Sequence, residues 1–449
     1  MLRPDAGQVV PRHRFSVGMI GLFIRLVVLG GVSLRAAARV LEMLVEILGW
    51  GGEVPHWTTG RLWLLRLGLH QLTAGKRRAE DWAWITDHSV QIGTQKCLVI
   101  VGIRLRDLPP PGQCLRHQDV ELIGLVPMES STRVSVYQEL KAAVKVTGVP
   151  KVIVDDHGTD LTGGVQLFQQ EHAQTVEIYD AKHKAACVLK RRLEQDEEWG
   201  RYESLVGQTR CALQQTELAC LVPVGPRPKA RFMNLSPLLE WGVRVLAVLR
   251  NPPPELQNER ARARLGEKLG WLAEFEGRLQ QWGQWQRIVQ TVVERVGRCG
   301  LYAGAAGDLE QELGGTLSVA SWHPSSQSLA EELLGFVSGE SAKVPAGVRF
   351  PGSTEVLESL FGKFKTLERQ QAKGGFTALL LGFGTLVGQA VCKTMGKLGQ
   401  LVVEALDQNL TRDVIEWCRE NLGTTLSSQR RHVFAYARNA QQKPDEGPG

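Results

Sequence analysis

The middle of the chain carries short apolar, β-branched runs bounded by glycine, proline or polar clusters, a pattern that predicts β-strands. Five such runs occur, at 83–90, 96–105, 120–126, 151–154 and 176–179. Segments with apolar residues every three or four positions predict helices at 132–146, 161–170 and 181–193. Gly93 and Thr94 can form a hairpin turn between the first two strands. The predicted order is β-β-β-α-β-α-β-α, an antiparallel meander followed by alternating units.

The first 80 residues have a helical pattern instead. Ser33 is a predicted N-cap, because apolar residues at helical spacing follow it. Thr58 or Thr59 is the predicted cap of a second helix, with leucines 62, 65, 69 and 72 on one face. Arg61 and Arg66 lie off that stripe and are expected to face outward. Two helices joined by a turn, with basic residues facing outward, can place one helix in the major groove of DNA. We therefore predict a helix-turn-helix-like DNA-binding region, and a helical hairpin without DNA binding is the alternative.

The remainder divides into further predicted parts. The predicted domains begin with a basic helical region at 1–80 and the first part of an α/β core at 81–195. A helical insertion at 196–350, the last part of the core at 351–420 and a tail at 421–449, whose end is disordered, follow. The insertion contains six tryptophans, and five of them are each expected in its core: Trp199, Trp241, Trp271, Trp282 and Trp285. An uncharged stretch at 374–391 is close to the shortest length that spans a bilayer, but its glycines favour a buried helix.

Composition excludes some classes of protein. A chain of 449 residues is too long for one ordinary core. The net charge of +6 is compatible with a polyanionic partner such as DNA. None of the eight cysteines forms a Cys-x-x-Cys pair, which argues against a zinc ribbon and favours reduced thiols in the cytoplasm. Walker, serine-hydrolase and His-Glu-x-x-His motifs are absent from the sequence.

Three carboxylates stand at positions that could form a metal site. Asp87 lies in the first predicted strand, Asp156 ends the fourth, and Glu358 lies near the start of a later helix. Neighbouring strands are about 4.8 Å apart, so the two aspartates would meet if these strands are adjacent. Carboxylate oxygens are the ligands that Mg²⁺ prefers, and two such ions can promote phosphoryl transfer.

Each of the last two assignments has a neighbouring alternative. Asp155 could replace Asp156, because a shift of one residue exchanges the faces of a strand. Glu355 could replace Glu358, but only Glu358 is followed seven residues later by a cation, Lys365, on the same helical face.

This arrangement of strands, helices and carboxylates resembles the ribonuclease H-like fold of DDE transposases and retroviral integrases. The resemblance covers roughly residues 20–395 and is strongest at Asp87, Asp156 and Glu358. It implies an α/β protein with a ribonuclease H-like mixed sheet and a large all-α insertion. It also implies an insertion-sequence transposase that uses two Mg²⁺ ions, or Mn²⁺ in their place, to cut transposon ends and join them to target DNA. Such a protein would act in the cytoplasm at the nucleoid, as at least a dimer on DNA.

The resemblance also suggests roles for further residues. The family often has a Lys or Arg at the position of Lys365, where it could grip a phosphate. Asp180 and His183 resemble a Cys/Asp-x-x-His signature of branches with a helical insertion, where the histidine could orient a metal ligand or a DNA phosphate. A structural histidine is the alternative. Two other functions stay open, a ribonuclease H-like nuclease that does not transpose and a catalytically inactive DNA-binding relative.

Overall fold

The structure is a computed structural model that describes residues 9–50, 53–92, 94–225, 235–316, 322–370, 376–391, 395–423 and 433. The chain divides into two compact units. Unit 1 comprises residues 1–179 and 353–449, and unit 2 comprises residues 180–352. The predicted tail at 421–449 lies almost entirely outside the described residues.

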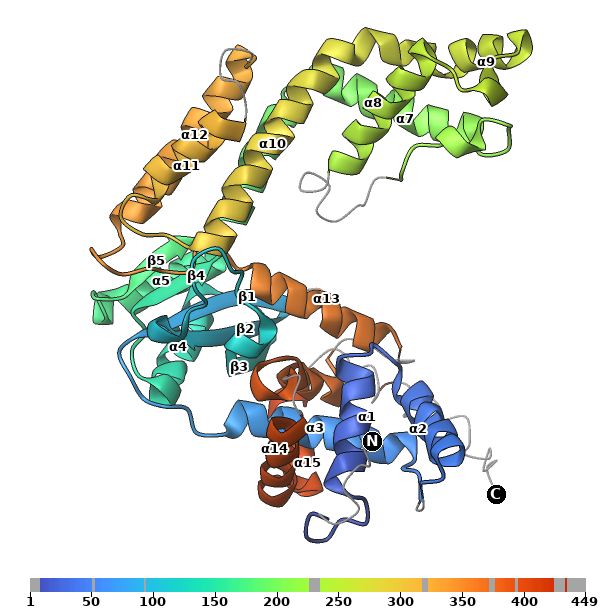
Figure 1. The fold of residues 1–449 in the computed structure, drawn as a ribbon. Helices are drawn as coiled ribbons and strands as arrows, with labels where there is room; N and C mark the ends of the chain where they lie inside the picture. The colour runs from blue at the N-terminus through green and yellow to red at the C-terminus, as the bar shows by residue number, and fades with distance from the viewer. Residues whose placement is uncertain are drawn as a thin grey trace, which may run out of the picture. The chain divides into compact units, whose positions relative to one another are not determined.

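A five-stranded mixed sheet forms the centre of unit 1 (Figure 1). Its strands are β1 (Trp82–Ile92), β2 (Gln95–Arg104), β3 (Glu121–Met128), β4 (Val152–Asp155) and β5 (Val176–Tyr179). The strand order is β3-β2-β1-β4-β5. The first three strands pair antiparallel, whereas β4 pairs parallel with both β1 and β5. The predicted α/β class, the five strands and the adjacency of the first and fourth strands are therefore confirmed.

Helices pack on this sheet because their apolar residues recur on one face. The helices α4 (Arg133–Thr147) and α5 (Thr159–Glu171) cover one side, close to their predicted bounds. Their buried residues share a core with every second residue of the strands: Trp82, Trp84, Leu98, Ile100, Ile153, Val136, Leu140, Leu161, Val165 and Phe168. A later helix, α13 (Glu355–Arg369), packs against β1 through an apolar stripe. The sheet is thus held by elements from both ends of the chain.

The rest of unit 1 is helical. Its elements are α1 (Val17–Val28), α2 (Leu34–Leu48), α3 (Trp57–Thr73), η1 (Leu105–Asp107), η2 (His117–Asp119), η8 (Ala378–Leu386), η9 (Gly388–Val391), α14 (Met395–Gln408) and α15 (Thr411–Leu422). Ser33 caps α2 as predicted, since its side chain accepts a hydrogen bond from the amide of Ala36. The cap of α3 was predicted wrongly. It is His56, and Thr58 lies inside the helix with its hydroxyl 2.7 Å from His56 Nδ1.

Helix α3 does not present a basic outer face. It is buried on most sides, and Arg66 is only 5% exposed. The guanidinium of Arg66 donates to the carbonyl oxygens of Leu406 and Asn409, both at 2.5 Å. The predicted outward position of Arg66 is therefore wrong, because distant carbonyls satisfy its charge inside unit 1. Arg61 is partly buried, and its contact with DNA stays a prediction.

Replacing Arg66 should weaken unit 1. We expect Arg66→Ala to lower the free energy of unfolding by about 2–3 kcal/mol, because hydrogen bonds to a charged group are lost inside a packed region. Urea denaturation measures the change. Arg39→Ala is the matched control on exposed α2, where a shift of at most about 0.5 kcal/mol is expected. Equal stability of the two variants would contradict a structural role for Arg66.

The apolar stretch predicted as one buried helix is buried, but it forms the two 3-10 segments η8 and η9. A Cβ added to Gly68 would lie 1.7 Å from the carbonyl oxygen of Leu381, so only glycine allows this approach of α3 to η8. Among the described residues, none of the helices is both long and apolar enough to cross a membrane. No disulfide joins the cysteines in the described part of the chain.

Unit 2 consists of helices, as predicted for most of its length. They are α6 (Ala181–Glu194), α7 (Glu197–Leu213), η3 (Ala219–Leu221), α8 (Ser236–Arg250), η5 (Pro254–Leu256), α9 (Glu259–Leu269), η6 (Gly270–Phe275), α10 (Glu276–Cys299), α11 (Ala305–Thr316) and α12 (Pro324–Ala342). Its bounds differ from the predicted insertion at 196–350, because α6 packs with α10 and α12.

Aromatic side chains fill the core of unit 2. The rings of Trp199 and Trp282 meet edge to face at 4.9 Å, and Tyr202 lies 5.3 Å from Trp282. Trp241 and Trp285 are also buried, whereas Trp271 is half-buried and donates to Thr209. The core role predicted for the tryptophans is confirmed for the four buried rings.

Candidate active site

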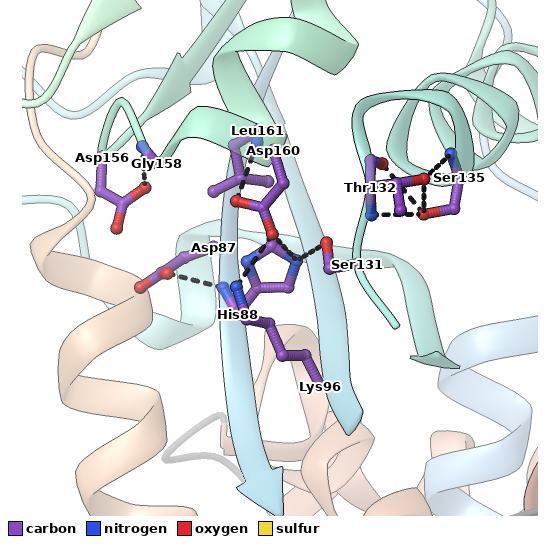
Figure 2. Close-up of polar contacts among 10 residues, drawn as sticks. All are labelled: Asp87, His88, Lys96, Ser131, Thr132, Ser135, Asp156, Gly158, Asp160 and Leu161. Carbon is purple, nitrogen blue, oxygen red and sulfur yellow. Dashed lines mark hydrogen bonds and ion pairs between the residues drawn. The ribbon is translucent and has the colours of Figure 1, made fainter. Parts of the chain in front are cut away.

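The parallel pairing of β1 with β4 decides where the two aspartates lie. Ala83 pairs with Val152 and Ile85 with Val154, a constant offset of 69 residues. Asp156 directly follows the end of β4, and an extension of this register by two residues would set it opposite Asp87. Side chains of paired residues in parallel strands point to the same face of the sheet. Figure 2 shows both carboxylates on the same side of β1.

Backbone amides hold the two aspartates. One carboxylate oxygen of Asp87 accepts a hydrogen bond from the amide of His88 at 2.6 Å, and Asp156 accepts one from Gly158 at 3.0 Å. Both side chains are partly exposed, so solvent or a ligand can reach them. Asp155 is fully buried and accepts from the amide of His157 at 2.7 Å. The register and the exposure therefore both favour Asp156 over Asp155 as the partner of Asp87.

The third predicted carboxylate lies on α13, the helix that packs against β1. Glu358 and Lys365 are exposed and lie two turns apart on the same face. Between them, Gly362 borders open space, since a Cβ added there would meet nothing within 4 Å. Glu355 is also exposed, one turn earlier, where its amide binds the hydroxyl of Ser353. The structure thus places Asp87 and Asp156 on neighbouring strands and Glu358 on a helix that contacts the strand of Asp87. Among the described residues, these three carboxylates do not form a group whose ligand atoms all lie within 4.8 Å of one another.

Asp180 and His183 belong to unit 2. Asp180 is fully buried and is the N-cap of α6, where its carboxylate accepts a hydrogen bond from the amide of Lys182 at 2.9 Å. His183 lies in the first turn of that helix and is partly exposed. The Asp180 side chain therefore has a structural role as a helix cap. The predicted role of His183 in orienting a metal ligand or a DNA phosphate stays a prediction.

The opposite face of β1 carries a polar network that the sequence did not reveal. Lys96 pairs with Asp160 at 2.9 Å, and Ser131 lies 2.9 Å from Nε2 of His88 (Figure 2). Burial lowers the pKa of His88, an effect that the charge of Asp160 opposes. Asp160 lies in the first turn of α5, whose N-cap is Gly158. His88 thus links β1 to Ser131, in the segment between β3 and α4.

Asp160 should make unit 1 sensitive to acid. Burial alone would raise its pKa, but hydrogen bonds from Lys96 and Ser131, with the nearby positive charges, lower the pKa from 3.8 to about 2. A depressed pKa stabilises the folded state above the unfolded value of 3.8, and this contribution is lost as the pH falls toward 2. We therefore expect Asp160→Asn to be less stable than the wild type at pH 7, with the difference vanishing near pH 2.

Urea midpoints measured between pH 2 and pH 7 would test this expectation. Asp107→Asn is the control, since Asp107 is an exposed residue of the short η1 segment. A difference between wild type and Asp160→Asn that stayed constant with pH would exclude the ionic contribution.

Three residues of β4, the turn after it and β5 also lie together: Asp155, His157 and Glu177. The sequence pointed to Asp155 only as an alternative to Asp156, and it did not point to His157 or Glu177. Ligand atoms of all three lie within 4.8 Å of one another. A signal was present, because a glutamate inside a short apolar strand and a histidine directly after two aspartates are unusual.

No known protein family matches this sequence, and neither does any curated protein.

Proposed function

We propose that this protein is a DDE-type transposase that cuts DNA at transposon ends and transfers the freed strand into target DNA. The observation that supports the proposal is the parallel pairing of β1 with β4, whose register, extended by two residues, points to Asp87 and Asp156 as neighbours on one face of the sheet. Two carboxylates close together on adjacent strands would repel each other, and a bound cation would remove that repulsion.

The fold supports the same proposal. An antiparallel meander precedes two parallel strands, and β1 and β4 are neighbours, as the ribonuclease H-like resemblance requires. The helix with Glu358 returns to unit 1 after the helical unit 2 and packs against β1. We therefore assign the sheet of unit 1 to a ribonuclease H-like core and unit 2 to the insertion.

The donor set fits magnesium. Asp87, Asp156 and Glu358 offer only oxygen ligands and are open to solvent, which suits an ion that retains several waters. These three residues would hold the metal, and two bound Mg²⁺ ions would supply the positive charge that phosphoryl transfer needs.

The chain's other groups would position the DNA. Lys365 and Lys363 are exposed on α13 close to Glu358, where their ammonium groups can bind phosphates flanking the cut. In the first reaction a water oxygen bonds to phosphorus and loses a proton, the P–O3′ bond breaks, and the released 3′ oxygen takes up a proton to become a hydroxyl. In the second reaction that hydroxyl attacks a target phosphate and displaces another 3′ oxygen. No bond between protein and DNA is required.

The test uses the full chain and a labelled duplex carrying the inverted repeat that bounds its own gene. With Mg²⁺ we expect cutting at the repeat boundary and joining of the 3′ end to a supercoiled plasmid, and with EDTA neither reaction. A duplex with the repeat shuffled is the control.

Other outcomes would change the conclusion. Cutting without joining would favour a ribonuclease H-like nuclease. Binding to the repeat without cutting would favour an inactive relative of transposases. Neither binding nor cutting would overturn the proposed function.

A further inference from the structure

A second group of metal-ligating side chains lies at the end of β4. It consists of Asp155, His157 and Glu177, here called the β4 cluster. Each residue offers a ligand atom, and these atoms all lie within 4.8 Å of one another. A single ion with ligand bonds of about 2.0–2.2 Å can bridge atoms at such separations after small side-chain movements.

The pairing of β4 with β5 brings these side chains together. Ile153 pairs with Glu177 and Asp155 with Tyr179. Residues two apart on a strand share a face, so Asp155 and Glu177 point to the same side of the sheet. Asp156 points to the other side, as expected for the next residue along the strand. The β4 cluster is therefore distinct from the carboxylates of the proposed active site.

The backbone and a neighbouring ring orient His157. Its φ of 59° lies in the left-handed region, which few residues other than glycine adopt. The imidazole stacks on Tyr179 with a centroid distance of 4.0 Å and an interplanar angle of 1°. Nε2 of His157 lies 3.4 Å from a carboxylate oxygen of Glu177. The nitrogen is thus held toward the carboxylates before any ligand binds.

Burial gives the cluster a strong preference for positive charge. Asp155 is fully buried, and the side chain of Glu177 is only 14% exposed. Two carboxylates so close together in a poorly solvated position repel each other, and a divalent cation would neutralise both. His157 is the exposed member, so an ion could enter from its side.

We propose that the β4 cluster binds a divalent transition-metal ion of the Zn²⁺ or Mn²⁺ class. The imidazole of His157 favours a transition-metal ion, because Mg²⁺ binds mainly oxygen ligands whereas transition-metal ions also bind imidazole nitrogen. This site does not depend on the proposed function. It lies at the turn between β4 and α5, which also contains Asp156. The metal would therefore support the structure at this turn rather than react with DNA.

Pulsed electron paramagnetic resonance of the full chain tests the proposal. The protein is loaded with one equivalent of Mn²⁺ in excess Mg²⁺, which fills sites made of oxygen alone. We expect ¹⁴N modulation from a coordinated imidazole in the wild type. The modulation should disappear in His157→Gln and persist in His172→Gln, a histidine outside the cluster, and in Asp87→Asn.

A second measurement protects against a folding defect. Equilibrium dialysis with Zn²⁺ should show one equivalent fewer bound to Glu177→Gln than to the wild type, with unchanged circular dichroism. Absence of ¹⁴N modulation in the wild type, or equal modulation in His157→Gln, would overturn the proposal and indicate a simple His157–Glu177 ion pair. DNA cleavage is not part of either readout, so failure here leaves the proposed function untouched.

Discussion

Asp87→Asn, Asp156→Asn and Glu358→Gln are each expected to abolish Mg²⁺-dependent DNA cleavage while binding to the repeat persists. Each substitution keeps the shape of the side chain but removes the negative charge that a Mg²⁺ ligand needs. Loss of one charge-stabilising group from an active site typically slows the reaction at least about 100-fold. Cleavage and gel-shift assays on the same labelled duplex measure the two properties separately.

Two neighbouring residues provide sharp controls for this set. Glu355→Gln changes the same residue type one turn earlier on α13 and should leave cleavage intact. Asp155→Asn discriminates between the two adjacent aspartates. Cleavage lost in Asp155→Asn but retained in Asp156→Asn would show that the register of β1 and β4 was interpreted wrongly. Cleavage retained in any of the three main variants would remove that residue from the site.

Trp282→Ala is expected to destabilise unit 2 by about 3–5 kcal/mol, the cost of removing a large aromatic ring from a core. Trp282 is 1% exposed and packs against Trp199, Tyr202 and Phe275. Its indole nitrogen also donates to a carboxylate oxygen of Asp196 at 3.0 Å. Hydrogen exchange measured by mass spectrometry should show faster exchange across residues 180–352.

A conservative variant separates packing from hydrogen bonding. Trp282→Phe keeps an aromatic ring but loses the donor to Asp196, so it should destabilise unit 2 less than Trp282→Ala does. Unchanged exchange in Trp282→Ala would contradict the core assignment. If Trp282→Ala left hydrogen exchange unchanged but lost DNA cleavage and joining, a base-stacking role for Trp282 would replace the structural one.

The strands and helices of the α/β part were predictable because their signals are local. Alternating or continuous apolar runs such as 96–105 identify strands, and turn residues delimit them. Every predicted strand in unit 1 agrees with the structure within two residues at each end. The prediction that Asp87 lies near Asp156 needed only the assumption that the first and fourth strands are neighbours, and these strands are neighbours in the structure.

What the sequence could not reveal depends on contacts between distant segments. Arg66 looks exposed on a helical wheel, but its partners lie about 340 residues later at the end of α14. The buried stretch after residue 376 follows a 3-10 path because the backbone of Gly68 approaches Leu381. The β4 cluster escaped because it requires the register of β5 beside β4, which a four-residue strand does not encode.

Unit 1 is assembled from two stretches of chain, with all of unit 2 made between them. A ribosome therefore releases the sheet residues Asp87 and Asp156 first, then 173 residues of unit 2, and only afterwards the helix with Glu358. During synthesis the apolar stripe of α13 is missing from β1, and the proposed carboxylate set is incomplete. Under the proposed function, a nascent chain or a product truncated before residue 353 would lack the third carboxylate and is expected not to cut DNA.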